Sequence, residues 1–188
     1  LVMKAENTFQ YNSPKYKDLL KEFRQNDGSK HMLIVFAGAF DTNRNAAVDE
    51  LKREIIGEPV EIDLTEIVTP YEEESYAQID ARLNDIPSDS SLVIFRNAEQ
   101  LNGVYTAFSA SITKYAPPQE KYFLKKIKDI NCPVLLEFND LDQLDQTVTR
   151  TADSVVLFNP PSSLLESIAW KIKNLHVHGS RFLSPRPH

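Results

Sequence analysis

Five short apolar runs, each followed by a segment in which apolar residues recur at helical spacing, extend through most of this chain. Strands are expected at residues 32–37, 60–63, 92–95, 133–138 and 154–158. The run at 92–95 is apolar throughout, which is typical of a strand buried on both faces of a sheet. Strands that alternate with helices favour a parallel sheet with helices on both faces. We therefore expect an α/β fold of three layers, α/β/α, around a five-stranded parallel sheet.

Helices are expected between the strands and at both ends of the alternating pattern. Their approximate ranges are 14–25, 45–56, 71–86, 98–114, 119–130 and 162–175. The first begins at Ser13-Pro14, where a capping residue is followed by a proline at the first helical position. In the helix at 45–56 the residues expected to face inward are Ala46, Ala47, Val48, Leu51 and Ile55.

Length, charge and cysteine content limit the class of protein. A chain of 188 residues is long enough for one compact domain, expected at residues 1–175, with a flexible tail at 176–188. The net charge of −6 argues against nucleic acid as the main partner, because phosphate binding requires clustered Lys and Arg. No apolar run approaches the roughly 18 residues of a membrane span, and Cys132 is the only cysteine. These features indicate a cytoplasmic protein with neither a membrane nor a nucleic-acid partner.

Residues 38–45 follow the first expected strand and precede a helix, which is the setting of a phosphate-binding loop with the pattern G-x-x-x-x-G-K-[ST]. Gly38 matches the first glycine, but the other fixed positions hold Asn43, Arg44 and Asn45. Backbone amides wrap a phosphate only where the chain takes conformations that side chains resist, so such loops use several glycines. The segment 38–45 contains one glycine. It therefore has the position of a phosphate loop but lacks the residues usual for one.

The order of these segments resembles the core of the AAA+ ATPases, a branch of the P-loop NTPase superfamily, over about residues 12–172. The family's Walker B segment, four apolar residues and then Asp-Glu-Ala-Asp, falls on Leu92 to Glu99. Its sensor-1 strand, which ends in Thr-Asn, corresponds to Phe138-Asn139. The resemblance implies a P-loop NTPase-like fold. We expect the AAA+ core without the family's C-terminal helical lid, for which too few residues follow residue 175.

The residues that differ from the family pattern are those that carry its chemistry. In a working member, a lysine neutralises the β and γ phosphates and a neighbouring hydroxyl holds Mg²⁺, but Arg44 and Asn45 occupy these positions. Arg96 and Asn97 replace the Walker B Asp and Glu. A cation repels Mg²⁺, and an amide is no general base at neutral pH. Asp41 adds a carboxylate that repels the γ-phosphate, so the resemblance implies a nucleotide site that has lost its activity.

Several residues have a simpler alternative interpretation. Asn139 matches the sensor position, yet an asparagine after a strand also forms turns. Arg150 corresponds either to an arginine finger or to a solvated side chain. His176 and His178 have the spacing of metal ligands, but a single pair in a tail is usually incidental, so no metal is expected.

The substituted residues also suggest how the site is filled. If the loop and the third strand converge as in the family, Asp41 and Arg96 are expected to form an ion pair in the place of phosphate and metal. Arg44 is an equal candidate to pair with Asp41, and the sequence leaves the choice open.

The leading hypothesis is a catalytically inactive AAA+-like domain, a pseudo-ATPase, that acts as a protein-interaction or assembly module. It implies no cofactor and one or more unknown protein partners, with a homo-oligomer as one form of assembly. The alternative is a divergent ATP-binding protein or weak ATPase in which Arg44 replaces the lysine and ATP binds with Mg²⁺. A third version binds nucleotide without hydrolysing it and acts as a ligand-gated switch.

Overall fold

The computed structural model describes residues 6–102 and 118–158, which belong to one compact unit. The helix expected at 98–114 is described only as far as residue 102. The expected helix at 162–175 and the tail at 176–188 lie outside the described residues. The domain boundary expected at residue 175 therefore stays a prediction.

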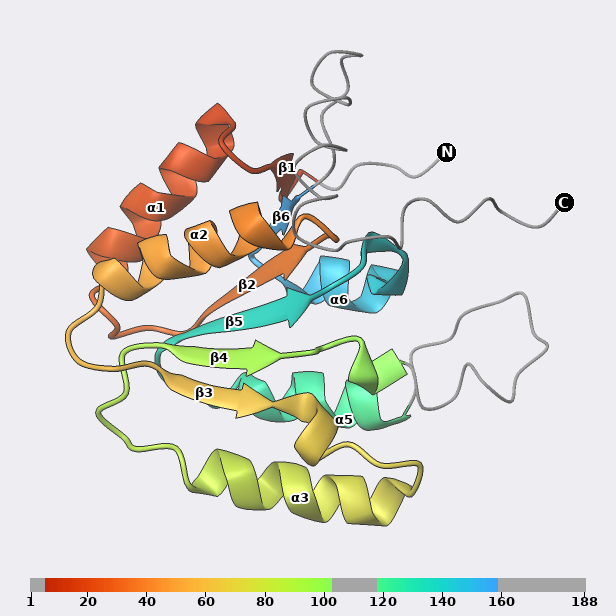
Figure 1. Ribbon diagram of the computed structural model, residues 1–188. Coiled ribbons are helices and arrows are strands. Elements are labelled where there is room, and N and C mark those ends of the chain that lie inside the picture. Colours follow the sequence, from red (N-terminus) through yellow and green to blue (C-terminus); the bar gives the residue numbers. More distant parts are fainter. Residues whose placement is uncertain (1–5, 103–117, 159–188) are drawn as a thin grey trace, which may run out of the picture. The chain divides into compact units, whose positions relative to one another are not determined.

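A six-stranded parallel sheet forms the centre of this unit, with the spatial order β1-β6-β2-β5-β4-β3 (Figure 1). The strands are β1 (Thr8–Gln10), β2 (Met32–Ala37), β3 (Val60–Asp63), β4 (Val93–Arg96), β5 (Pro133–Phe138) and β6 (Ser154–Leu157). The five predicted strands are confirmed. The predicted number of strands is wrong, because β1 adds a sixth beside β6. With three residues, two of them polar, β1 is too short to show a strand pattern in the sequence.

Five α-helices and two 3-10 turns lie wholly within the described residues, which also include helical residues 100–102. They are α1 (Pro14–Asn26), α2 (Asp41–Arg53), α3 (Glu72–Asn84), α5 (Pro118–Ile127), α6 (Gln146–Thr151), η1 (Leu64–Glu66) and η2 (Leu141–Gln143). The start of α1 is confirmed, since the Ser13 hydroxyl accepts a hydrogen bond from the Tyr16 N–H at 3.3 Å. The short helix α6 is not predicted by the sequence pattern. Asp145 begins it by accepting a hydrogen bond from the Val148 N–H at 2.9 Å.

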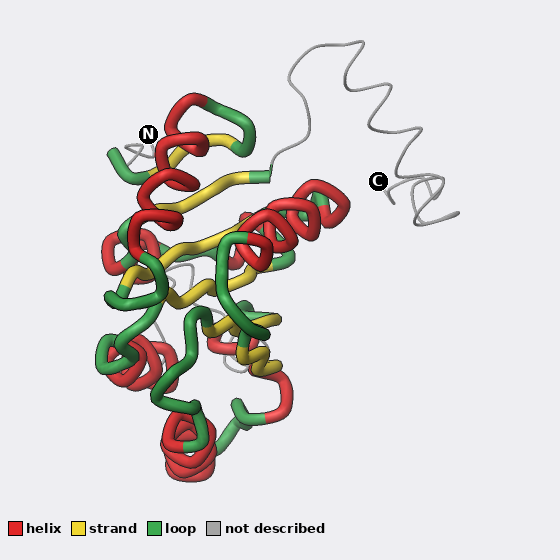
Figure 2. The backbone as a smooth tube through the Cα atoms, turned by 90° about the vertical axis from the view of Figure 1, so that its left-hand side faces the viewer, coloured by secondary structure: helices red, strands yellow, loops and turns green. Residues whose placement is uncertain are grey.

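Side-chain alternation along the strands decides which helices cover which face of the sheet. On one face, Val35 of β2 and Leu136 of β5 join a core cluster with Ile79 of α3, Phe123 of α5 and Val148 of α6. The residues between them on the strands point to the opposite face, which α1 and α2 cover. Figure 1 shows α1 and α2 on one face and α5 and α6 on the other, and Figure 2 shows helices on both sides of the strands. The three-layer arrangement is therefore confirmed.

Glu120, in the first turn of α5, is fully buried behind this sheet. Neither of its carboxyl oxygens makes an aligned hydrogen bond with the described part of the chain. Burial and the nearby carboxylate of Asp145 raise the pKa of Glu120 from 4.5 to about 9. The folded protein therefore binds this proton more tightly than the unfolded chain does. The resulting stabilisation is complete below the unfolded pKa and is lost as the pH rises through the folded pKa.

Replacing Glu120 with glutamine is expected to stabilise the protein in neutral and alkaline solution, because the amide never has to ionise inside the core. The free energy of unfolding of the variant should equal that of wild type near about pH 4.5 and exceed it by on the order of 2 kcal/mol at about pH 8. The difference is smaller than the full cost of ionising Glu120, because a buried amide without a hydrogen bond also costs free energy. Urea unfolding followed by circular dichroism across this range measures it. Glu58→Gln, at an exposed position, is the control. A gain that does not change with pH would contradict the prediction.

Candidate functional site

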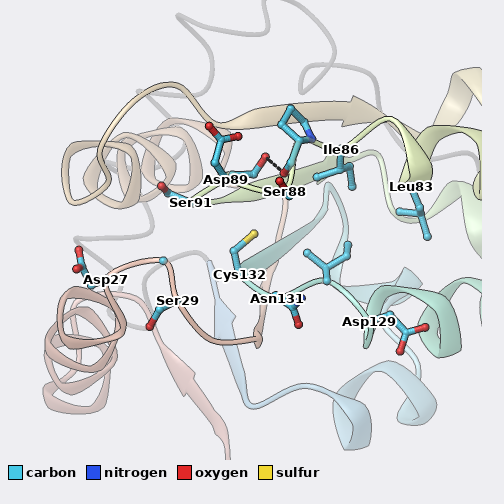
Figure 3. Close-up of a pocket in the computed structure, with 14 residues that line it drawn as sticks. Asp27, Ser29, Leu83, Ile86, Ser88, Asp89, Ser91, Asp129, Asn131 and Cys132 are labelled. Atoms are coloured by element: carbon cyan, nitrogen blue, oxygen red, sulfur yellow. Dashed lines mark hydrogen bonds between the residues drawn. The ribbon is translucent and has the colours of Figure 1, made fainter.

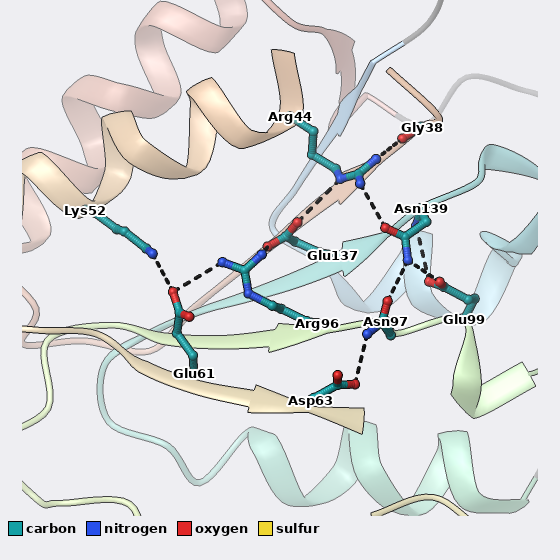
Figure 4. A network of polar contacts seen from close by, with 10 residues as sticks. All are labelled: Gly38, Arg44, Lys52, Glu61, Asp63, Arg96, Asn97, Glu99, Glu137 and Asn139. Carbon is teal, nitrogen blue, oxygen red and sulfur yellow. Dashed lines mark hydrogen bonds and ion pairs between the residues drawn. The ribbon is translucent and has the colours of Figure 1, made fainter. Parts of the chain in front are cut away.

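The candidate site lies at the carboxyl ends of β2 and β5, two adjacent strands at the centre of the sheet. The helix that follows β2, α2, covers one face of the sheet, whereas α6, which follows β5, packs on the other. In parallel α/β sheets, such a change of direction opens the crevice where ligands bind. Gly38 comes directly after β2 and Asn139 directly after β5, so the expected phosphate loop and sensor position meet here, as Figure 4 shows.

The expected phosphate loop is mostly helix, and the predicted start of the second helix at residue 45 is wrong. Helix α2 begins at Asp41, which leaves only residues 38–40 to connect β2 to α2. No glycine or proline follows Gly38 in this segment, and a carboxylate in the first turn favours a helix start through the macrodipole. In this segment the Asp41 N–H donates to the Ala39 carbonyl at 2.9 Å and the Arg44 N–H donates to the Phe40 carbonyl at 3.1 Å.

The early start also changes which side chains of α2 face inward. Arg44 is buried with Ala47, Val48 and Leu51, while Ala46, expected to be buried, is exposed. Among the remaining site candidates on this helix, Asn45 is exposed, and Asp41 and Asn43 are half-buried.

Gly38 has a backbone conformation that side chains resist. Its φ angle is +143°, and its N–H donates a hydrogen bond to the Phe138 carbonyl at 3.2 Å. A Cβ atom at this position would lie 2.9 Å from the Phe158 carbonyl carbon. The Gly38 carbonyl accepts a hydrogen bond from the guanidinium of Arg44. Gly38 therefore offers an acceptor to the crevice, whereas a phosphate requires donors.

The guanidinium of Arg44 is committed to groups inside the protein. Its Nε lies 3.4 Å from the Glu137 carboxylate, and its Nη2 donates to the Asn139 side-chain oxygen at 2.8 Å. The residue is only 6% exposed. Arg44, which the sequence pattern places at the lysine position of a phosphate loop, thus joins α2 to the ends of β2 and β5.

Glu137 receives a second guanidinium from the neighbouring strand. Arg96 Nη1 lies 3.3 Å from Glu137 Oε1, an ion pair without the alignment of a hydrogen bond. Glu137 is 3% exposed. Burial raises the pKa of Glu137, although Arg96 and Arg44 oppose this effect and favour the ionised form. Two arginines therefore share one buried carboxylate beneath the start of α2.

The ionic network continues from Arg96 toward the sheet edge. Its Nη2 donates to Glu61 of β3 at 3.2 Å, and the same carboxylate oxygen forms an ion pair with Lys52 of α2. Burial alone would raise the pKa of Glu61, but hydrogen bonds from Lys52 and Arg96 lower it overall. Figure 4 shows cations and carboxylates alternating from Lys52 to Arg44.

A second branch of the network runs through amide side chains. Asn139 Nδ2 donates to the Asn97 oxygen at 2.8 Å and also to Glu99, which accepts the Asn139 backbone N–H at 3.2 Å. Asn97, at a φ of +56°, donates to Asp63 at 2.9 Å. Hydrogen bonds from Asn97 and from Thr65 lower the pKa of Asp63. Both amide groups are thus used to hold strand ends together.

The structure brings together most of the candidates named from the sequence. Gly38, Arg44, Arg96, Asn97 and Asn139 belong to one network, whereas Arg150 is exposed in the last turn of α6. The carboxylate that Arg44 and Arg96 share is that of Glu137, which the sequence-based hypothesis of an Asp41 ion pair did not consider.

Glu137 had a recognisable signal in the sequence. It is the single charged residue in the strand Pro133–Phe138, and a charge in an otherwise buried strand requires a partner. The other network carboxylates missed from the sequence, Glu61 and Asp63, alternate with apolar residues and are typical of an ordinary half-buried strand.

The described residues show no group of three or more His, Cys, Asp or Glu side chains arranged to hold a metal ion. Within the same residues, no helix has both the length and the apolar character needed to cross a bilayer.

A hollow of about 440 Å³ lies at the opposite, amino-terminal ends of the strands (Figure 3). Loops before β2, β4 and β5 surround it, and its wall includes the exposed side chains of Asp27, Asp89 and Asp129. These carboxylates repel phosphate, and none belongs to the network at the carboxyl ends. We therefore place the candidate site at the carboxyl ends, where charged groups are buried and converge.

No protein-family model matches the sequence, and no curated protein matches it. Similar solved structures include a DNA polymerase III, gamma subunit-related protein from Thermotoga maritima MSB8, with a TM-score of 0.43 and 14% identity over 78% of this chain. They also include a chain in the HORMA:CdnC:Trip13 complex of E. coli MS115-1, with a TM-score of 0.50 and 15% identity over 89% of this chain. The chain spans 46% and 64% of the lengths of these two. The second similarity supports the fold described above, a three-layer α/β/α unit with a parallel sheet.

Proposed function

We propose that this protein is a catalytically inactive AAA+-like domain that acts by binding other proteins. The observation that carries the proposal is the buried Glu137 carboxylate, which pairs with Arg44 and with the half-buried Arg96 and so places the protein's own charges at the carboxyl ends of β4 and β5. A nucleotide phosphate entering here would have to displace a carboxylate from two guanidinium groups. Two backbone amides of the connection are already used, since the Gly38 N–H donates to the Phe138 carbonyl and the Asp41 N–H donates to the Ala39 carbonyl, and they cannot compensate for that loss.

The Walker B positions support the absence of hydrolysis. Arg96 is bound to Glu137 and Glu61, and the Asn97 amide joins Asp63 to Asn139. A general base must lie within hydrogen-bond reach of the attacking water, and neither of these side chains accepts a proton at neutral pH. A site with this arrangement has no group at these positions to activate water.

An interaction role is supported by what the domain retains. Within the described residues, six paired strands enclose an apolar core, and the network joins the carboxyl ends of the central strands through the protein's own side chains. The large apolar side chains of Ile56 and Tyr71 are 84% and 71% exposed. The E. coli chain of similar fold was solved within a complex of several proteins. We propose that this domain likewise contributes a surface of constant shape to an assembly, either with another protein or with copies of itself.

Wild-type protein is expected to show no change in melting temperature with ATP·Mg or ADP, and no phosphate release from ATP. Thermal-shift and calorimetric titrations beside a phosphate-release assay measure this. Binding without release would support the nucleotide-gated switch. Release above background would support the divergent ATPase. Either result would overturn the proposed function.

Two features would each make the site inactive, namely the substituted side chains and the start of α2 at Asp41. A variant with the motif residues restored distinguishes between them. We expect Arg44→Lys, Asn45→Thr, Arg96→Asp and Asn97→Glu together to remain silent in the same assays, because α2 still begins at Asp41. Nucleotide binding by this variant would show that side-chain loss alone inactivated the site. Light scattering on the wild-type protein tests the homo-oligomer.

A further inference from the structure

We propose that the Glu137 carboxylate is an internal anion that occupies an anion-binding site, and that removing it uncovers a site for pyrophosphate and related polyphosphates. The inference rests on the proposed function, since it explains how the crevice keeps its shape with no nucleotide.

The groups around Glu137 are those that proteins use to bind phosphate. Two guanidinium groups converge on its oxygens, at 3.4 Å from Arg44 and 3.3 Å from Arg96. Arginine is suited to carboxylate and phosphate alike, because both present oxygens that match its planar fork. The first turn of α2, which contains Arg44, adds the positive end of a helix dipole, and the Asp41 carboxylate in the same turn offsets part of it.

The bonding of Glu137 is incomplete for a residue so deeply buried. At 3% exposure, its Oε1 accepts no aligned hydrogen bond from the described residues and is held by the ion pair with Arg96. A carboxylate selected only for stability would have its oxygens satisfied, or would be replaced by an apolar residue. The Oε1 atom is thus held by its ion pair with Arg96 and not by a directed hydrogen bond, as an anion bound by charge would be.

Loss of the carboxylate leaves a local excess of positive charge. Among the described residues, Lys52, Arg96 and Arg44 are the cations of this branch, and Glu61 is its other carboxylate. Glu61 is also the more exposed of the two, with its side chain 38% accessible against 4% for Glu137. The uncovered charge would therefore be concentrated in the buried part of the crevice, where screening is weak.

The test titrates pyrophosphate into wild type, Glu137→Gln and Glu61→Gln, with sodium chloride at matched ionic strength as the reference. Glu137→Gln is expected to melt below wild type without added anion and to recover with pyrophosphate, with an apparent affinity at least about tenfold above that of wild type. Glu61→Gln, which removes a carboxylate from the same network, should respond as wild type does. An equal response in both variants would indicate non-specific anion binding and overturn the proposal.

Glu137→Asp keeps the test decisive if the glutamine variant does not fold. Its shorter carboxylate retreats from the arginines, so we expect a weaker but measurable response to pyrophosphate. If pyrophosphate raises neither the stability nor the folded yield of either variant, the inference is wrong. If pyrophosphate has no effect and wild-type protein also shows no response to ATP, only the further inference fails and the proposed function stands. If wild-type protein binds ATP, the proposed function itself is refuted.

Discussion

Replacing Arg44 with alanine is expected to lower the free energy of unfolding by about 3–5 kcal/mol, the usual effect of removing one partner from a buried ion pair. The change leaves the Glu137 carboxylate facing Arg96 alone in a buried environment. It also removes the donors to the Gly38 carbonyl and to the Asn139 side-chain oxygen. Because Arg44 joins α2 to two strand ends, the loss affects the whole crevice. Urea unfolding followed by circular dichroism measures the change. The dependence of the free energy of unfolding on urea concentration should be the same in variant and wild type.

Asn45→Ala is the matched control, since the next residue of the same helix is exposed. It should change stability by less than about 0.5 kcal/mol. A double variant, Arg44→Met with Glu137→Met, should recover most of the stability lost in Arg44→Ala, because apolar replacement of a whole buried pair is often neutral. If Arg44→Ala is no less stable than Asn45→Ala, the network is not a structural element of the domain.

Replacing Gly38 with alanine is expected to destabilise the protein by roughly 3–5 kcal/mol, from backbone strain and overpacking together. The φ angle of +143° is one that side chains rarely adopt. The added methyl group would press on backbone atoms of Phe158, which follows β6 and cannot move without disturbing its strand. Thermal and urea unfolding of the purified variant measure the loss.

Gly57→Ala separates strain from crowding. Gly57 also has a positive φ, +84°, but a methyl group added there would meet no described atom within 4 Å. This variant should lose about 1–2 kcal/mol, the strain of a left-handed conformation alone. Equal losses at both positions would mean that the close approach of Phe158 has no effect on stability.

The fold was predictable wherever a local pattern extended over several residues. The runs that became β2, β4 and β5 are apolar because both faces of a central parallel strand are buried, and this leaves a signal in the sequence. Helix α1 was predictable because Ser13, Pro14 and its apolar stripe agree. By contrast, β1 and α6 are held by pairing with β6 and by the Asp145 cap, and both are too short for periodicity to show.

The candidate site was predictable in position but not in its contacts. The carboxyl ends of parallel strands lie at one edge of the sheet. Three candidates are found at such ends, since Arg96 is the last residue of β4, and Gly38 and Asn139 directly follow β2 and β5. The start of α2 could not be predicted from the phosphate-loop pattern. Arg44, in the first turn of α2, finds its buried acceptors on β5 and at Gly38, and no local pattern in the sequence predicts these contacts.

The sequence by itself determined that strands and helices alternate around a parallel sheet and which charged and amide residues follow the strands. Both are statements about residue types in order along the chain. Only the tertiary structure decided which groups these residues contact. The partnership of Arg44 and Arg96 with Glu137 joins three segments that are distant in sequence, and it exists because β2, β4 and β5 are neighbours in the sheet. Ion pairing depends on distance in space and on burial, and neither is encoded in any short stretch of residues.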